Sequence, residues 1–211
     1  MSRADIAEAE RLRLAERLST DTGIEKWPNL VEMFFGQAER MGQAPFLWRK
    51  DGGSWQSISW AAAAQTVATI ATALKAQGMK PGARVMLVSE NRPEFCLWDL
   101  GIMAAGGVTV PTYTTNTARD HLHILENSGA VAAVVSTARL AKPLLEAAYQ
   151  SANCRHIIGL EPLQFEQAAG AVELLDAGAL LAAHPGNIAA VRAAVTARRS
   201  DTACLIYTSG T

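Results

Sequence analysis

The sequence predicts an α/β fold in which helices cover a parallel sheet. Short apolar segments rich in β-branched residues recur along the chain, at 84–89, 108–110, 131–135, 156–160 and 203–207. Segments with helical patterning separate the first four of them, at 94–105, 120–127 and 138–149. This alternation is typical of parallel strands, because such strands cannot be joined by a tight turn and need a crossover.

The residues before 83 predict a helix, a β-hairpin and a second helix. Asn29 can cap a helix over 30–41, with Glu32 reaching back to the cap. A turn of one aspartate and two glycines at 51–53 lies between two strand-like segments, as in a hairpin. Ser59 can then cap the next helix.

We therefore expect three parts in the chain. They are an N-terminal helical arm at 1–28, a helix–hairpin–helix unit at 29–82, and an α/β subdomain at 83–211 that ends in a phosphate-binding loop. Within the last part, the alanine-rich tract 170–199 predicts helical or irregular structure. The charged arm is best explained as a solvated helix, although it also allows contact with a membrane surface.

The bulk composition indicates a globular protein. Of 211 residues, 49% are hydrophobic and 18% are charged. The net charge of −1 gives no field that would recruit nucleic acid. We see no apolar run long enough to span a bilayer and no signal peptide, so we expect a cytoplasmic protein. Cys96 and Cys204 lie in apolar stretches, which predicts buried, reduced thiols.

Several residues that could carry chemistry have simpler explanations. Gly106 and Gly107 end a helix rather than begin one, so close packing explains them better than dinucleotide binding. His121 and His123 are two apart on a helix and cannot bind one metal from the same face. The tryptophans, which include Trp48, lie in apolar or hairpin contexts, and we expect them to pack in the core rather than to stack on bases.

The segment that follows 203–207 is the strongest candidate for a binding site. Thr208, Ser209, Gly210 and Thr211 come directly after the apolar strand. Hydroxyl and backbone N–H groups in such a turn can be directed at phosphate oxygens, because glycine permits close approach. The turn lacks the lysine and the glycine spacing of a P-loop. Taken alone it could be an ordinary turn, but ligands of open α/β sheets bind where strands end.

Three stretches resemble one known family. Residues 84–95 contain the string SENRPEF, residues 103–113 read MAAGGVTVPTY, and residues 207–211 read YTSGT. In this order they resemble the N-terminal part of the AMP-forming acyl-CoA synthetases, within the adenylate-forming superfamily. Within that superfamily, these sequences are most similar to those of bacterial long-chain fatty-acid–CoA ligases.

The resemblance implies a fold, an activity and a site. The fold would be the N-terminal portion of the adenylate-forming enzyme fold, truncated. Its substrates would be ATP with Mg²⁺, CoA and a fatty acid, and the protein would form an acyl-adenylate and then an acyl-CoA. By position, Thr208, Ser209, Gly210 and Thr211 would bind the ATP phosphates. No catalytic or metal-binding residue of the family falls within 1–211, so we expect these residues alone to be inactive.

Two other interpretations stay open. The chain could be a non-catalytic α/β module for interaction or regulation, since a fold does not fix a function. It could also belong to an aryl- or medium-chain acyl-CoA ligase, because we expect the residues that shape the acyl pocket further along the chain. The oligomeric state and the membrane association that a fatty substrate would favour are not decided by the sequence.

Overall fold

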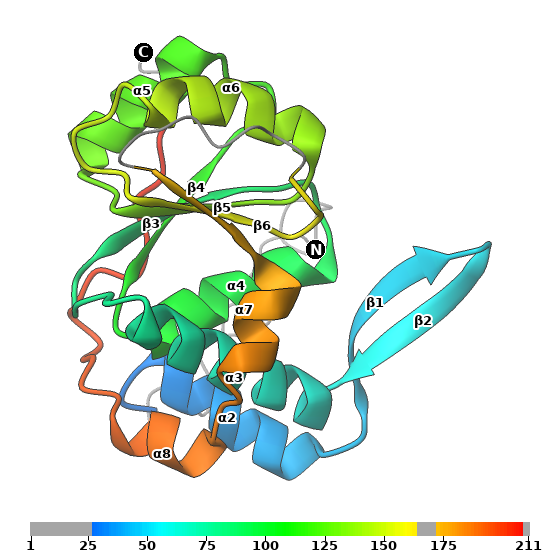
Figure 1. The fold of residues 1–211 in the computed structure, drawn as a ribbon. Coiled ribbons are helices and arrows are strands. Elements are labelled where there is room, and N and C mark those ends of the chain that lie inside the picture. The colour runs from blue at the N-terminus through cyan, green and yellow to red at the C-terminus, as the bar shows by residue number, and fades with distance from the viewer. Residues whose placement is uncertain (1–26, 164–171, 209–211) are drawn as a thin grey trace, which may run out of the picture.

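The computed structural model describes residues 27–163 and 172–208. The predicted arm therefore lies outside the described residues, apart from its last two positions. A five-stranded parallel sheet runs in the order β4-β3-β5-β6-β7, and a separate hairpin is formed by β1 and β2 (Figure 1). The strands are β1 (Pro45–Asp51), β2 (Ser54–Ser59), β3 (Arg84–Val88), β4 (Val108–Thr112), β5 (Ala132–Val135), β6 (His156–Gly159) and β7 (Glu173–Asp176).

Helices cover both faces of the sheet, as predicted (Figure 1). Side chains alternate across β3, so that Val85 and Leu87 belong to one apolar cluster and Met86 and Val88 to the other. The first cluster holds α2, α3, α4, α7 and α8, and the second holds α5 and α6. The helices are α2 (Leu30–Met41), α3 (Trp60–Ala76), α4 (Pro93–Ala104), α5 (Ala118–Ser128), α6 (Ala138–Ala148), α7 (Ala177–Ala183) and α8 (Ile188–Ala193).

The predicted helix starts are confirmed where a side chain can cap locally. The Asn29 side chain accepts a hydrogen bond from the Glu32 backbone, and Ser59 accepts one from Ala62. The start of α4 differs, because its N-cap is Arg92, which makes no side-chain cap bond. Pro93 at the first helical position still favours that start, since it has no N–H to satisfy.

One strand was not predicted. In the tract expected to be helical or irregular, β7 pairs with β6 in parallel, with Glu173 opposite His156 and Asp176 opposite Gly159. The His156 Nδ1 lies 3.3 Å from the Glu173 carboxylate, which adds a polar contact across the pair. The helices α7 and α8 follow, as the alanine-rich composition indicated.

The expected return to the sheet at 203–207 is reduced to a single bridge. Thr109 in β4 donates its N–H to the Ala203 carbonyl at 3.2 Å, and the Leu205 N–H donates to the Thr109 carbonyl at 2.9 Å. Cys204 thus bridges Thr109 in parallel, but no further pair extends the ladder among the described residues. Contrary to prediction, the side chains of Cys204 and Cys96 are exposed, whereas Cys154 is buried, which raises its pKa to about 12.

Candidate functional site

The switch point of the sheet lies at the carboxyl end of β3. The chain leaves β3 toward α4 on one face, whereas it leaves the neighbouring strands β4 and β5 toward α5 and α6 on the other face (Figure 1). Diverging connections open a crevice outside the strand ends, which is where open α/β sheets bind their ligands. Polar residues from three loops gather at this edge of the sheet.

Glu90 and Ser136 join the loops that follow β3 and β5. The Ser136 hydroxyl donates to the Glu90 carboxylate, and Arg139 Nη2 donates to it from 3.3 Å. The hydrogen bond from Ser136 is the main cause that holds the pKa of Glu90 below its ordinary value, and the charge of Arg139 acts in the same direction. Glu90 is therefore an ionised and well-partnered carboxylate at neutral pH, suited to holding loops rather than to donating a proton.

Arg92 joins the loop after β6 to the start of α4. Its Nε lies 2.9 Å from the Glu94 carboxylate, and its Nη1 lies 3.0 Å from that of Glu161. Arg49 of the hairpin also approaches Glu94, at 3.8 Å. Burial is the largest single influence and would raise the pKa of Glu94, but the hydrogen bond from Arg92, a backbone hydrogen bond and the charges of Arg92 and Arg49 together outweigh it, so the pKa is lowered. We call these residues, together with Glu90 and Arg139, the rim of paired charges at the carboxyl edge of the sheet.

The first of the predicted phosphate-binding residues, Thr208, does not lie at the carboxyl edge of the sheet. Thr208 is exposed and follows Tyr207, whose hydroxyl donates to Asn127 Oδ1 at 2.7 Å in the last turn of α5. That turn lies at the amino edge of the sheet, because Arg84 at the start of β3 donates to the Ser128 carbonyl at 2.6 Å. The structure therefore does not bring Thr208 to the rim of paired charges. Ser209, Gly210 and Thr211 lie outside the described residues, so their role stays a prediction.

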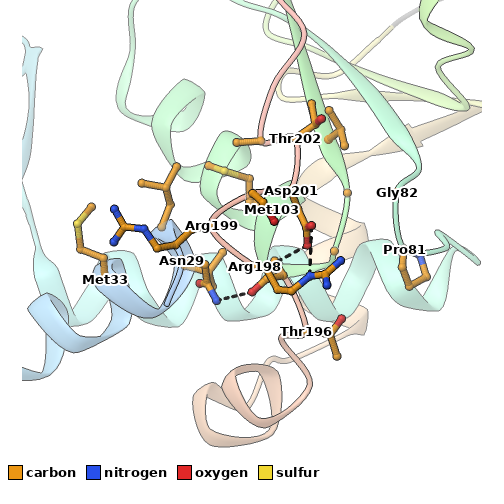
Figure 2. Close-up of a pocket in the computed structure, with 18 of the residues that line it drawn as sticks. Asn29, Met33, Pro81, Gly82, Met103, Thr196, Arg198, Arg199, Asp201 and Thr202 are labelled. Carbon is orange, nitrogen blue, oxygen red and sulfur yellow. Dashed lines mark hydrogen bonds and ion pairs between the residues drawn. The ribbon is translucent and has the colours of Figure 1, made fainter. Parts of the chain in front are cut away.

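A cavity of about 780 Å³ lies at the amino edge and was not predicted (Figure 2). It is bounded by the start of α2, by the turns before β3 and β4, and by residues 196–203. Asn29 Nδ2 donates to the Ala197 carbonyl at 2.8 Å, and Asp201 accepts from the Arg198 backbone at 2.8 Å. No sequence motif marked this cavity, because it forms where segments far apart in the chain meet.

The glycines and histidines considered above have structural explanations. A Cβ at Gly107 would lie 3.0 Å from the Ala83 carbonyl oxygen, which confirms close packing there. His121 is buried, which lowers its pKa, whereas His123 is exposed and lies edge-on to Tyr207. In the described part of the chain, no group of three or more histidine, cysteine, aspartate or glutamate side chains could hold a metal ion. None of its helices is both long and apolar enough to cross a membrane.

Comparisons with known proteins agree on one family for this chain. Residues 34–211 match the family described as AMP-binding enzyme. The long-chain-fatty-acid–CoA ligase FadD15 of Mycobacterium tuberculosis is 33% identical over 162 residues, which are 75% of this chain and 25% of that protein. The phenylacetyl-CoA ligase epaB of Aspergillus niger is also 33% identical, over 101 residues, or 46% of this chain and 19% of that protein.

A solved structure gives the same fold. The adenylation domain of a carboxylate reductase from Mycobacterium chelonae superposes on the whole chain with a TM-score of 0.69 at 18% identity, and the match covers 39% of that domain chain. This chain therefore spans about a quarter of the length of its curated long-chain relative and less than half of this structural neighbour.

Proposed function

Because this chain belongs to the AMP-binding enzyme family, we propose that it forms the N-terminal part of an ATP-dependent fatty-acid–CoA ligase. The observation that carries the proposal is the 33% identity to a long-chain ligase over three quarters of the chain. In the proposed reaction, a carboxylate oxygen of the acid attacks the α-phosphorus of ATP, and pyrophosphate leaves. The CoA thiolate then attacks the acyl carbon, and AMP leaves.

Within this proposal, the segment 208–211 binds the β- and γ-phosphates. Hydroxyl and N–H donors there would stabilise the charge that grows on departing pyrophosphate. Mg²⁺ would arrive with the ATP phosphates, which are its usual ligands in such sites. The segment would have to leave the amino edge, where Tyr207 is held by Asn127, and reach the carboxyl end of β3. A single bridge to β4 leaves it free of an extended strand ladder among the described residues.

The rim of paired charges has a supporting role in the proposal. Its two ion-paired groups connect the loops after β3, β5 and β6. Held together in this way, the loops would give the nucleotide a preformed wall, and preformed sites bind at a lower entropic cost.

Two alternatives are separable by substrate. The similarity to a phenylacetyl-CoA ligase favours an aryl acid as the second candidate. The third candidate is a non-catalytic module. The test is release of pyrophosphate by the protein that contains this chain, with MgATP, CoA and either palmitate, octanoate or phenylacetate.

Each outcome selects one candidate. We expect palmitate to give the highest kcat/KM, with AMP and palmitoyl-CoA formed in equal amounts. A preference for octanoate or phenylacetate would replace the long-chain acid with the corresponding substrate. Absence of pyrophosphate release with all three acids, in a folded protein, would favour the non-catalytic module.

A further inference from the structure

The hairpin of β1 and β2 exposes two tryptophans, although the sequence predicted that they would be buried. The side chain of Trp48 is 53% exposed and that of Trp55 is 65% exposed. The hairpin projects away from the body of the molecule (Figure 1). Exposure of a single large apolar residue is ordinary, but two on one projecting element indicate an interaction surface.

Both indoles lie on the same face of the hairpin. Trp48 pairs with Ser57 and Lys50 pairs with Trp55, and directly opposed residues of an antiparallel pair point to the same face. Trp48 and Lys50 are two apart on one strand, so they also share a face. We call these four residues the tryptophan face. Leu47 and Ile58, on the opposite face, pack against the core and fix which side faces outward.

We propose that the tryptophan face binds the interface of an anionic lipid bilayer. An indole combines an apolar ring with one N–H donor, and tryptophan concentrates at the headgroup level of membranes for that reason. Arg49 points to the opposite face, whereas Lys50 lies on the tryptophan face, directly opposite Trp55 and two residues from Trp48, and gives this face a basic group. Such groups are attracted to anionic headgroups.

The charges favour a lipid surface over a second copy of the chain. In a two-fold symmetric contact, the same patch meets itself, so Lys50 of each copy would approach its counterpart. Juxtaposed like charges oppose such an association. An anionic lipid surface instead supplies the opposite charge.

The position of the hairpin connects this surface to the candidate site. Arg49 approaches Glu94 at the start of α4, and α4 begins at the carboxyl end of β3. A bilayer that holds the tryptophan face would therefore lie near the carboxyl edge of the sheet. This part of the inference rests on the proposed function, since a long-chain acid dissolves in the bilayer and would enter from that side.

The experiment measures vesicle binding of the protein that contains this chain. It uses vesicles of equimolar phosphatidylcholine and phosphatidylglycerol, with brominated lipid to quench indole fluorescence. We expect binding with quenching, and a loss of about tenfold in affinity for the double variant Trp48→Thr, Trp55→Thr. Threonine retains the β propensity of the strands. Lys50→Glu should weaken binding to these vesicles and leave binding to pure phosphatidylcholine unchanged.

The matched control is Tyr149→Thr, which removes an aromatic ring that is 41% exposed at the end of α6. It should bind as the unaltered protein does. Equal binding by the double variant, or no binding at all, would overturn the inference. A dimer that forms without lipid and is lost in the double variant would assign the face to a second copy instead.

The outcome is independent of the reaction. Vesicle binding needs no ATP or CoA, so binding without pyrophosphate release would refute only the proposed function. Pyrophosphate release from dispersed palmitate, without vesicle binding, would refute only the lipid interface.

Discussion

The guanidinium of Arg192 in α8 lies 2.9 Å from the carboxylate of Glu32 in α2, although the two residues are separated by most of the described chain. Arg192 also approaches Glu39, about two turns further along α2, at 3.4 Å. The ion pair joins the first described helix to the last one and thereby holds the C-terminal segment against the body of the molecule.

Replacing Arg192 with alanine should destabilise the fold modestly. The side chains of Arg192 and Glu32 are 31% and 22% exposed, so solvent screens the pair only in part. We expect the free energy of unfolding to fall by about 1 kcal/mol, which lowers Tm by roughly 2–4 °C for a chain of this size. Thermal unfolding followed by circular dichroism measures the change. Arg198→Ala, which removes an 81% exposed partner of Asp201, should cost less, and an equal cost would contradict the explanation.

Gly186 should not tolerate a side chain. Its carbonyl accepts from Gln65 Nε2 at 2.8 Å and its N–H donates to Thr69 Oγ1 at 3.2 Å, so it lies directly on α3. A Cβ there would collide with the backbone of Ala68 and Thr69. We expect Gly186→Ala to cost about 1–3 kcal/mol in urea unfolding, as overpacking does.

The control for this substitution is Gly178→Ala. The added Cβ would meet only the Asp176 side chain, at 3.2 Å, within the first turn of α7. It should leave the unfolding midpoint nearly unchanged, because alanine favours the helix and the nearby carboxylate can move. Similar losses for both variants would show that close approach to α3 is not the cause.

Ser136→Ala should destabilise the protein in a pH-dependent way. A carboxylate whose pKa is lowered in the folded state adds stability above its ordinary pKa of 4.5, and that stability is lost as pH falls through the lowered value. Removal of the hydroxyl should therefore cost about 1 kcal/mol at pH 7, since Glu90 is 40% exposed and water screens part of the bond. The cost should shrink in acid, where Glu90 is protonated.

Urea unfolding at pH 7 and at the lowest pH that keeps the protein folded would measure how much free energy of unfolding Ser136→Ala costs at each pH. Ser128→Ala is the matched control, because that buried hydroxyl donates to the uncharged Ile124 carbonyl at 2.6 Å. Its cost should not depend on pH. A cost for Ser136→Ala that is equal at both pH values would exclude Glu90 as the cause.

The proposed phosphate contacts predict a kinetic effect. Thr208→Val and Ser209→Ala should each lower kcat for pyrophosphate release by roughly 100- to 1000-fold, the range expected when a donor to developing charge is removed. The KM for the acid should change little. Thr66→Val, which removes a hydroxyl that donates within α3, should keep full activity. Activity of the two loop variants within about twofold of the unaltered protein would remove the segment from the site.

Local signals made much of the fold predictable. Asn29, Ser59 and the turn at 51–53 act within a few residues of themselves, so their effects can be read from neighbours in sequence. The capping partner Glu32 shows the limit, because its side chain binds Arg192 rather than reaching back to Asn29. A partner 160 positions away leaves no trace in the local pattern.

The missed features depend on tertiary neighbours. Glu173–Asp176 is short and half polar, and it becomes a strand because β6 offers it an open edge. Trp55 and Trp48 resembled core residues by type, but a hairpin with packing on one face leaves the other face exposed. For the candidate site, the sequence pointed to Thr208 but not to the hydrogen bond that the preceding Tyr207 donates to Asn127, nor to the pairing of Glu90 with Ser136 between the loops after β3 and β5.

The strand order also has a consequence for synthesis. Because β3 is formed first and has a neighbour on each side, the sheet can grow outward from it as the chain emerges, with β4 added on one side and then β5, β6 and β7 on the other. The outer edge of β4 meets its only described partner at Cys204, about ninety residues after β4 is complete. At about 5–20 residues per second, the ribosome leaves that edge unpaired for roughly 5–20 s. During this interval the nascent chain presents an open template for strand addition, so protection by a chaperone would matter most there.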